Sequence, residues 1–178
     1  MKANSQVSVR EITKDEIGAA FQFIRDNYRK LYKSDFNPRM HYKILSIEEY
    51  YLKPVDCALL AAFNTDGEII GVITVEPYDD RIPVLRSIYD PGRTAELSRC
   101  YVDKRCRRAG IGSMLFEEAQ LFCLMNGYQV LYLHTHQFLP GALEFWQSRG
   151  FVVRIEAGDE HGTLHMDKSL YFGQRSCV

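Results

Sequence analysis

The first part of the chain shows the apolar periodicities of one strand and two helices. Residues 7–12 alternate apolar and polar side chains, which is typical of a half-buried strand. Residues 13–16, Thr-Lys-Asp-Glu, form a capping-box pattern, and apolar residues at helical spacing continue to about Leu31. Residues 46–49 form a weaker capping box, which predicts a short helix that Pro54 closes.

The middle of the chain predicts a hairpin followed by a long irregular connection. Two apolar runs, residues 57–63 and 69–75, flank the turn sequence Asn-Thr-Asp-Gly at 64–67. We therefore expect two antiparallel neighbouring strands. Residues 76–94 are rich in proline, aspartate and arginine and form an unusually long connection for a compact domain, which makes them a candidate functional loop.

The second half of the chain alternates strand and helix patterns. We expect strands at 95–102, 129–135, 151–155 and 163–170 and helices at 110–125 and 140–149. The whole order is strand, helices, three strands, helix, strand, helix and two strands. It predicts an α/β fold with a mixed, largely antiparallel central sheet of about seven strands, flanked by helices on both faces.

Length and charge narrow the possible functions. The 178 residues suit a single domain, with residues 1–6 and 171–178 expected to be flexible ends. A formal net charge of -1 provides no broad basic field, so we expect no nucleic-acid partner.

The cysteines and the apolar runs bear on the cellular location. The five cysteines contain no Cys-x-x-Cys pair, which favours reduced thiols and argues against a redox or zinc centre. Neither a signal peptide nor a run of about 18 apolar residues is evident. We expect a cytoplasmic protein that does not bind a membrane.

Residues 95–113 carry the most informative pattern, because a strand leads into a glycine-bearing turn that begins a helix. The first amides of a helix have no internal partners and, with the helix dipole, form an anion site. Arg107 and Arg108 add positive charge, and Lys104 and Arg105 enlarge the patch. Gly-x-Gly before a helix also fits an ordinary tight turn. The turn lacks the third glycine of a dinucleotide fingerprint and the Gly-Lys-Ser/Thr ending of a Walker loop.

A family resemblance distinguishes an anion-binding turn from an ordinary tight turn. Arg107-x-x-Gly110-x-Gly112 after a strand resembles the coenzyme A signature, Gln/Arg-x-x-Gly-x-Gly/Ala, of the GNAT superfamily of N-acetyltransferases. Residues 142–151 are similar to the family's Ala-x-x-Phe-Tyr-x-x-x-Gly-Phe segment, and the resemblance extends over roughly residues 7–170.

The resemblance implies a GNAT-like sheet, acetyl-coenzyme A as co-substrate and direct acetyl transfer to a primary amine of a small molecule or peptide. The residues that it implies for cofactor binding are Tyr101, Val102, Arg107, Arg108, Ala109, Gly110, Ile111, Gly112, Ser113, Phe145 and Trp146.

The resemblance also implies two catalytic positions on the strand before the loop. A glutamate occupies the position of Glu96 in several family members, where it accepts the amine proton directly or through water; otherwise Glu96 is a surface carboxylate. The amide of Cys100 would polarise the acetyl carbonyl. By the two-residue period, Glu96, Ser98, Cys100 and Val102 should share one face. Direct transfer requires no acyl-enzyme, so Cys100 is not expected to be a nucleophile.

One departure from the family concerns the proton for the leaving thiolate. Many members have a tyrosine where this chain has Trp146, whose indole N–H has no usable acidity. The proton would come from water, Tyr132 or Tyr101, or the thiolate would leave unprotonated, or the enzyme would be impaired. Trp146 itself would pack on the pantetheine arm or belong to the core.

Two histidines lie close to the predicted cleft. His134 and His136 share a strand face, where either could contact substrate or shuttle protons. Since no third ligand occurs at a recognisable spacing, we expect no metal site.

The acceptor class stays open. Aromatic and acidic side chains would suit a cationic amine, whereas Arg81, Arg86 and Arg93 would suit an acidic one. The residues that could line the acceptor site are Tyr28, Tyr32, Tyr42, Tyr50, Tyr51, Asp79, Asp80 and Tyr89.

Two other functions compete with N-acetyl transfer. Residues 96–99 after an extended loop resemble acyl-homoserine lactone synthases, which favours longer acyl chains, although those enzymes generally lack the Arg-x-x-Gly-x-Gly loop. Trp146 motivates a noncatalytic acyl-coenzyme A-binding sensor. An extended edge strand near the C-terminus could support a homodimer.

Overall fold

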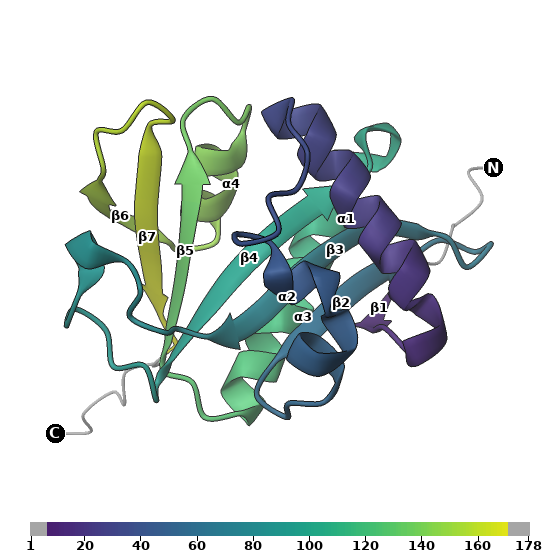
Figure 1. Ribbon diagram of the computed structural model, residues 1–178, viewed down its shortest axis with the longest axis horizontal. Coiled ribbons are helices and arrows are strands. Elements are labelled where there is room, and N and C mark those ends of the chain that lie inside the picture. Colours follow the sequence, from purple (N-terminus) through teal and green to yellow (C-terminus); the bar gives the residue numbers. More distant parts are fainter. Residues whose placement is uncertain (1–6, 171–178) are drawn as a thin grey trace, which may run out of the picture. The chain divides into compact units, whose positions relative to one another are not determined.

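The computed structural model describes residues 7–170, and the expected flexible ends lie outside these residues. The strands and helices follow the predicted order (Figure 1). In chain order they are β1 (Ser8–Glu11), α1 (Ile17–Tyr32), α2 (Tyr42–Leu45), β2 (Ala58–Phe63), β3 (Ile69–Pro77), β4 (Thr94–Val102), α3 (Ile111–Met125), β5 (Val130–His136), α4 (Ala142–Ser148), β6 (Val152–Glu156) and β7 (Thr163–Ser169). Four short helical turns accompany them: η1 (Lys14–Glu16), η2 (Glu48–Leu52), η3 (Pro83–Leu85) and η4 (Lys104–Cys106).

The strands form a seven-stranded sheet in the order β1-β2-β3-β4-β5-β7-β6. The β1–β2, β2–β3, β5–β7 and β6–β7 pairs are antiparallel, whereas β4 and β5 are parallel. This arrangement confirms the predicted α/β fold with a mixed, largely antiparallel sheet flanked by helices.

The chain divides into two compact units. The expectation that it forms a single domain stays a prediction. Unit 1 comprises Met1–Glu76 and Leu97–Phe122, and unit 2 comprises Pro77–Glu96 and Cys123–Val178. Within residues 7–170, every helix is too short or too polar to cross a lipid bilayer.

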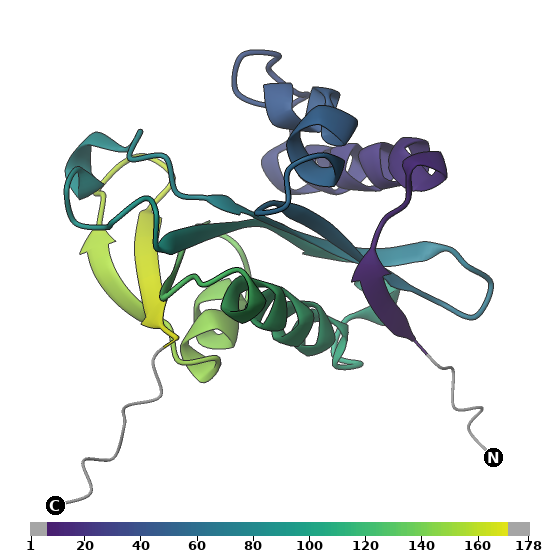
Figure 2. The same cartoon turned by 90° about the horizontal axis from the view of Figure 1, so that it is seen from below.

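In unit 1, helices cover both faces of strands β1–β3. Figure 2 shows α1 and α2 on one face and α3 on the other. Every residue of β2 is consequently buried, which explains why its sequence is a continuous apolar run without alternation. The predicted capping box starts the first helix, where the Thr13 amide donates to the Glu16 carboxylate at 2.8 Å. Lys33, in the left-handed conformation, ends α1.

The second predicted helix differs in form. A short helix, α2, precedes residue 46, and the turn that follows it is the wider η2, in which the Lys53 amide donates to the Glu48 carbonyl at 3.1 Å. The chain leaves this turn before Pro54, as expected. The turn carries Tyr51 into the core of unit 1.

Gly71 on β3 sets the position of the start of α3. A Cβ at this residue would lie 2.9 Å from Leu115 Cδ1, 3.2 Å from Ile111 Cγ2 and 3.2 Å from the Tyr101 carbonyl oxygen. The absence of a side chain at Gly71 therefore lets the first turn of α3 approach the strands closely.

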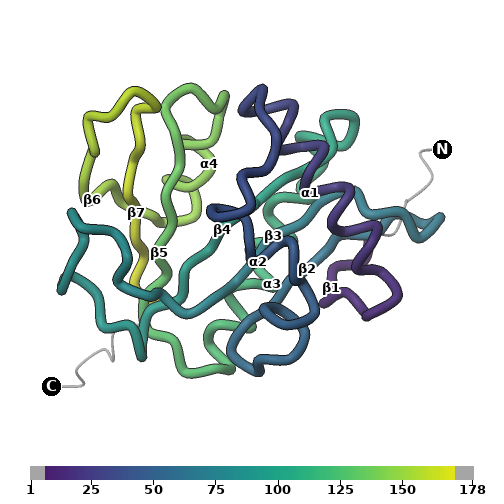
Figure 3. Tube along the Cα trace, in the orientation of Figure 1, coloured from purple at the N-terminus to yellow at the C-terminus, as the bar shows by residue number. Residues whose placement is uncertain are grey.

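In unit 2, the long connection between β3 and β4 is folded rather than open. Leu85 of η3 is fully buried, together with the rings of Tyr78, Tyr89 and Tyr132. The Tyr89 hydroxyl donates to Asp167 of β7 at 3.0 Å. The connection thus lies against β5 and β7 (Figure 3).

Candidate active site

The predicted phosphate loop lies in unit 1 and has the backbone of an anion site. Arg108 and Gly110 adopt left-handed conformations, with φ of 65° and 82°. The Gly110 carbonyl accepts the first bond of α3 from Met114 at 3.0 Å, so the amides of Ile111 and Gly112 have no acceptor within the helix. Residues 107–110 are exposed. This arrangement suits a pyrophosphate at the positive end of the α3 dipole.

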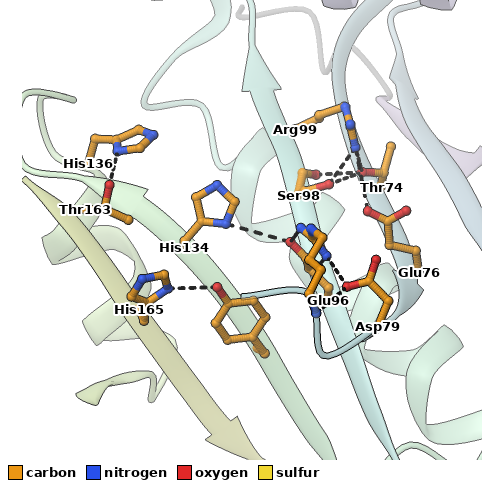
Figure 4. Close-up of polar contacts among 12 residues, drawn as sticks. Thr74, Glu76, Asp79, Glu96, Ser98, Arg99, His134, His136, Thr163 and His165 are labelled. Atoms are coloured by element: carbon orange, nitrogen blue, oxygen red, sulfur yellow. Dashed lines mark hydrogen bonds and ion pairs between the residues drawn. The ribbon is translucent and has the colours of Figure 1, made fainter. Parts of the chain in front are cut away.

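Strand β4 contains a bulge that the alternation pattern did not predict. Arg99 has φ of 51°, in the left-handed region. The side chains of both Ser98 and Arg99 consequently contact Thr74, through Ser98 Oγ at 2.8 Å and Arg99 Nη1 at 3.5 Å (Figure 4). Adjacent residues of a regular strand would point to opposite faces. The prediction that Glu96, Ser98, Cys100 and Val102 share one face is therefore wrong, because the bulge shifts the alternation at Arg99.

The Cys100 thiol is unsuited to nucleophilic catalysis. Cys57, Cys100, Cys106 and Cys123 are free, and Cys177 lies outside the described residues. Burial raises the pKa of the Cys100 thiol to about 12, so it stays protonated at neutral pH. This agrees with the expectation that only the backbone amide of Cys100 takes part.

In unit 2, Glu96 is buried and held by two basic side chains. Its carboxylate is 1% exposed and accepts two bonds from Arg81, Nη1 to Oε2 at 2.6 Å and Nη2 to Oε1 at 2.7 Å. The same pairing raises the pKa of Arg81 above its usual range, so the guanidinium stays charged. His134 Nδ1 lies 3.7 Å from Glu96 Oε1, and its ring is 36% exposed (Figure 4). Glu96 is thus no surface carboxylate, although the Arg81 and His134 side chains that face it are 44% and 36% exposed.

The two tyrosines considered as proton donors are poor acids. Burial raises the pKa of the Tyr132 hydroxyl, which lies 2.9 Å from His165 Nδ1. Burial likewise raises the pKa of Tyr101. A hydroxyl that the sequence did not single out is that of Tyr78, which is buried without a hydrogen-bond partner among residues 7–170. Burial raises its pKa as well.

Trp146 packs within unit 2. It is 7% exposed and makes edge contacts with Phe145 and Phe151, at ring-centroid distances of 4.8 and 5.4 Å. This packing supports the core interpretation of the indole.

The candidate acceptor-lining residues include buried, half-buried and exposed side chains, and Tyr28, Tyr32 and Asp80 are half-buried. Tyr51 and Tyr89 are buried and belong to the cores of their units. Tyr42 and Tyr50 are exposed and contact each other, and Asp79 is bound to Arg81 at 2.7 Å. Among residues 7–170, no three histidine, cysteine, aspartate or glutamate side chains are grouped to hold a metal ion.

Buried histidines should make unfolding pH-dependent. Burial lowers the pKa of both His165 and His136 below the ordinary value of about 6.5. Between the folded and unfolded pKa values the unfolded chain binds more protons, so stability should fall as pH decreases through 6.5 and level off below the folded pKa. Urea unfolding at pH 7.5, 6.5 and 5.5 should show this loss, with a shallower slope for His165→Gln. Equal slopes would show that His165 is not responsible.

Comparison with known proteins identifies the class. The sequence model of the acetyltransferase (GNAT) family matches residues 21–151. The chain belongs to this acetyltransferase (GNAT) family. The reaction class of the family is acetyl transfer from acetyl-coenzyme A to an amine, so the resemblance inferred from residues 107–112 and 142–151 is confirmed.

The relatives agree with this class. N-acetylaspartate synthetase from Homo sapiens is 26% identical over 164 residues, which cover 89% of this chain and 50% of that protein. The Danio rerio N-acetylaspartate synthetase is 27% identical over 124 residues, covering 69% and 39%. The chain spans about half the length of the curated relatives it matches.

Solved structures share the fold. An acetyltransferase of the GNAT family from Staphylococcus aureus Mu50 superposes with a TM-score of 0.76 at 18% identity, covering 93% of this chain and all of that one. The PaiA N-acetyltransferase from Thermoplasma acidophilum, solved in complex with coenzyme A, gives a TM-score of 0.67 at 18% identity and covers 92% and 99%.

Proposed function

We propose that this chain transfers the acetyl group of acetyl-coenzyme A directly to a primary amine, with loop 107–112 binding the pyrophosphate of the cofactor. The observation that carries the proposal is the exposed turn in which left-handed Arg108 and Gly110 lead into the start of α3. Backbone amides and two guanidinium groups at one helix start suit a pyrophosphate. The family match and the coenzyme A bound to the Thermoplasma acidophilum relative support this role.

The remaining cofactor contacts extend along the chain from this loop. Tyr101 and Val102 precede it on β4 and would contact the pantetheine arm, and Ala109 and Ser113 complete the turn. Phe145 and Trp146 of α4 are proposed to contact the arm as well, although the indole is largely covered by aromatic neighbours.

The proton acceptor is proposed to be His134 acting with Glu96. Both Glu96 oxygens are engaged by Arg81, which leaves the carboxylate poorly placed to take a proton directly from an ammonium group. His134 is more exposed and lies 3.7 Å from that carboxylate. An imidazole takes up a proton readily near neutral pH, and the Glu96 charge would stabilise the resulting imidazolium.

The acetyl carbonyl and the leaving thiolate need two further groups. The Cys100 amide on β4 is proposed to polarise the carbonyl oxygen, in line with its family position. With the pKa values of Tyr101 and Tyr132 raised by burial, the thiolate would leave unprotonated or take its proton from water.

The acceptor is proposed to be a small molecule or peptide with a primary amine. The name of the matched relatives, N-acetylaspartate synthetase, supports an amino acid as the acceptor. Location in the cytoplasm and assembly into a homodimer are also proposals. The dimer would use β6, which ends the sheet and pairs only with β7 among the described strands.

Release of the coenzyme A thiol tests the function. Purified chain with acetyl-coenzyme A should release thiol in the presence of at least one amine from a panel of amino acids, polyamines and peptides. Calorimetry should detect binding of both coenzyme A and acetyl-coenzyme A. Binding without turnover of any amine would favour the sensor, and a preference for octanoyl- over acetyl-coenzyme A would favour longer acyl chains. No binding of either carrier would reject the proposal.

A further inference from the structure

Arg99 is a largely buried cation whose hydrogen bonds to residues 7–170 all come from one nitrogen of its guanidinium. Its side chain is 16% exposed and projects from the β4 bulge of unit 1. A left-handed backbone at a non-glycine residue costs energy, and such strain persists where the surroundings fix it. The bulge re-aims the guanidinium onto the same face as Ser98.

One nitrogen of the guanidinium makes all of its contacts. Arg99 Nη1 donates to Ser98 Oγ at 2.8 Å and to the Tyr51 hydroxyl at 3.0 Å, and approaches Thr74 Oγ1 at 3.5 Å (Figure 4). Nε and Nη2 donate to none of residues 7–170. They are also absent from the fully buried side-chain atoms of this range that lack a hydrogen-bond partner, a group that includes Tyr78 Oη. These two nitrogens therefore keep some exposure to solvent, on a side chain that is 16% exposed.

The nearby carboxylate does not satisfy Arg99. Glu76 Oε1 lies 3.9 Å from Nη1, beyond hydrogen-bond distance. The other oxygen of Glu76 accepts from Lys43 Nζ at 2.6 Å and faces the Tyr51 hydroxyl at 3.4 Å. Burial raises the pKa of Tyr51, so this hydroxyl stays protonated and can accept from Arg99 while donating to Glu76. The cluster positions the guanidinium but leaves its Nε–Nη2 edge unpaired.

Two other arginines of unit 1 use that edge to hold a carboxylate, whereas Arg10 binds Glu16 through Nη1 and Nη2. Arg105 binds Asp103 through Nε at 3.2 Å and Nη2 at 2.8 Å. Arg25 binds Asp35 through the same two nitrogens, at 3.4 and 3.3 Å. The parallel N–H groups of this edge match the two oxygens of a carboxylate.

We propose that the Nε–Nη2 edge of Arg99 binds a carboxylate of the acceptor, so that the amine substrate is an amino acid or another carboxylate-bearing amine. The inference rests on the proposed function and specifies its substrate class. Glu76, held by Lys43 and Tyr51, fixes the orientation of the cluster. Ser98 Oγ and Thr74 Oγ1 are also within hydrogen-bond reach of Arg99 Nη1, at 2.8 and 3.5 Å.

The test compares acids with their amides. Each protein amino acid is screened by thiol release, and the best acceptor is compared with its α-amide and, for aspartate and glutamate, with asparagine and glutamine. The wild type should favour the acid in kcat/KM by at least about 100-fold, because two charge-assisted bonds are lost with the neutral amide. Arg99→Gln should lower kcat/KM for the acid by about 100- to 1000-fold and for the amide by less than about threefold, and Arg99→Lys should be intermediate.

The control is Arg25→Gln, which removes an arginine of unit 1 whose carboxylate edge is already occupied by Asp35. It should keep the preference for the acid. A structural role of Arg99 would instead lower acid and amide equally. Equal use of acid and amide by the wild type, or an acid preference that survives Arg99→Gln, overturns the inference while leaving amine acetylation intact.

If no amine is acetylated, the proposed function fails and calorimetry decides the inference separately. L-aspartate should then bind the coenzyme A-loaded wild type at least about tenfold more tightly than L-asparagine or the α-amide of aspartate. Loss of this difference in Arg99→Gln supports the carboxylate site. Its absence in the wild type rejects it.

Discussion

Replacing Glu96 by glutamine is expected to lower kcat by about 100- to 10,000-fold, the range that general acid–base catalysis contributes. Glutamine keeps the size of the side chain but removes the charge that faces His134 at 3.7 Å and Arg81 at 2.6 and 2.7 Å. An imidazolium at His134 would then lack its carboxylate partner. KM for acetyl-coenzyme A should change little, because Glu96 is not part of loop 107–112. Steady-state thiol release measures both constants.

The control for this variant is Asp79→Asn. It removes the other carboxylate that binds Arg81, at 2.7 Å, but from an exposed position where an ion pair contributes little. It should keep kcat within about twofold. A thermal melt is needed for both variants, because Glu96→Gln leaves part of a buried guanidinium pair unsatisfied.

A double variant separates a direct role of Glu96 from one through His134. If the two residues act as a unit, His134→Gln should lose about as much activity as Glu96→Gln, and the double variant little more. The rate of each variant should rise with pH until the acceptor amine loses its own proton, ordinarily at about pH 8–10. Additive losses of activity in the double variant would show that Glu96 and His134 act independently. If Glu96→Gln kept the wild-type kcat, the catalytic base would be another residue.

The sequence predicted those parts of the molecule that local chemistry determines. The hairpin around Gly67 and the capping box at Thr13 were readable because turn and cap residues act on their neighbours. The phosphate loop was readable for the same reason: Gly110 supplies the left-handed conformation at the start of α3.

The parts that depend on distant contacts were not readable. Arg81 reaches Glu96 only because the connection between β3 and β4 folds back through buried Leu85 and Tyr89. The bulge at Arg99 interrupts an apparently regular strand, and an arginine gives no local signal for a left-handed backbone. The one sequence feature that indicated an irregularity in this strand was the charged side chain of Arg99 near its middle. The sequence thus pointed to loop 107–112 and Glu96 as candidate site residues. It did not predict that Arg81 and His134 face Glu96, or that Arg99 has a left-handed backbone.

Replacing Gly110 by valine is expected to weaken coenzyme A binding by about 10- to 100-fold, the equivalent of one hydrogen bond to a charged group. Gly110 has φ of 82°, which a β-branched residue adopts only with strain. Apart from its chain neighbours, no heavy atom lies within 4 Å of the position its Cβ would take, so the Cβ itself causes no clash in the folded protein. The cost in unfolding free energy should be about 1–3 kcal/mol of backbone strain. We expect the backbone around residue 110 to shift and so relieve the strain. This shift would displace the amides of Ile111 and Gly112, which are the groups proposed to bind phosphate.

Gly67→Val is the matched control for this experiment. Gly67 has φ of 78°, also has no atom within 4 Å of its Cβ position, and lies in the hairpin turn of the same unit. Both variants should therefore lose similar stability in urea unfolding, while only Gly110→Val loses affinity for coenzyme A in calorimetry. Equal affinities in the two variants would mean that strain at the start of α3 does not reach the cofactor, and the pyrophosphate would have to bind elsewhere. A loss in both would indicate a general effect of destabilisation. Only the asymmetric result ties the helix amides to the cofactor.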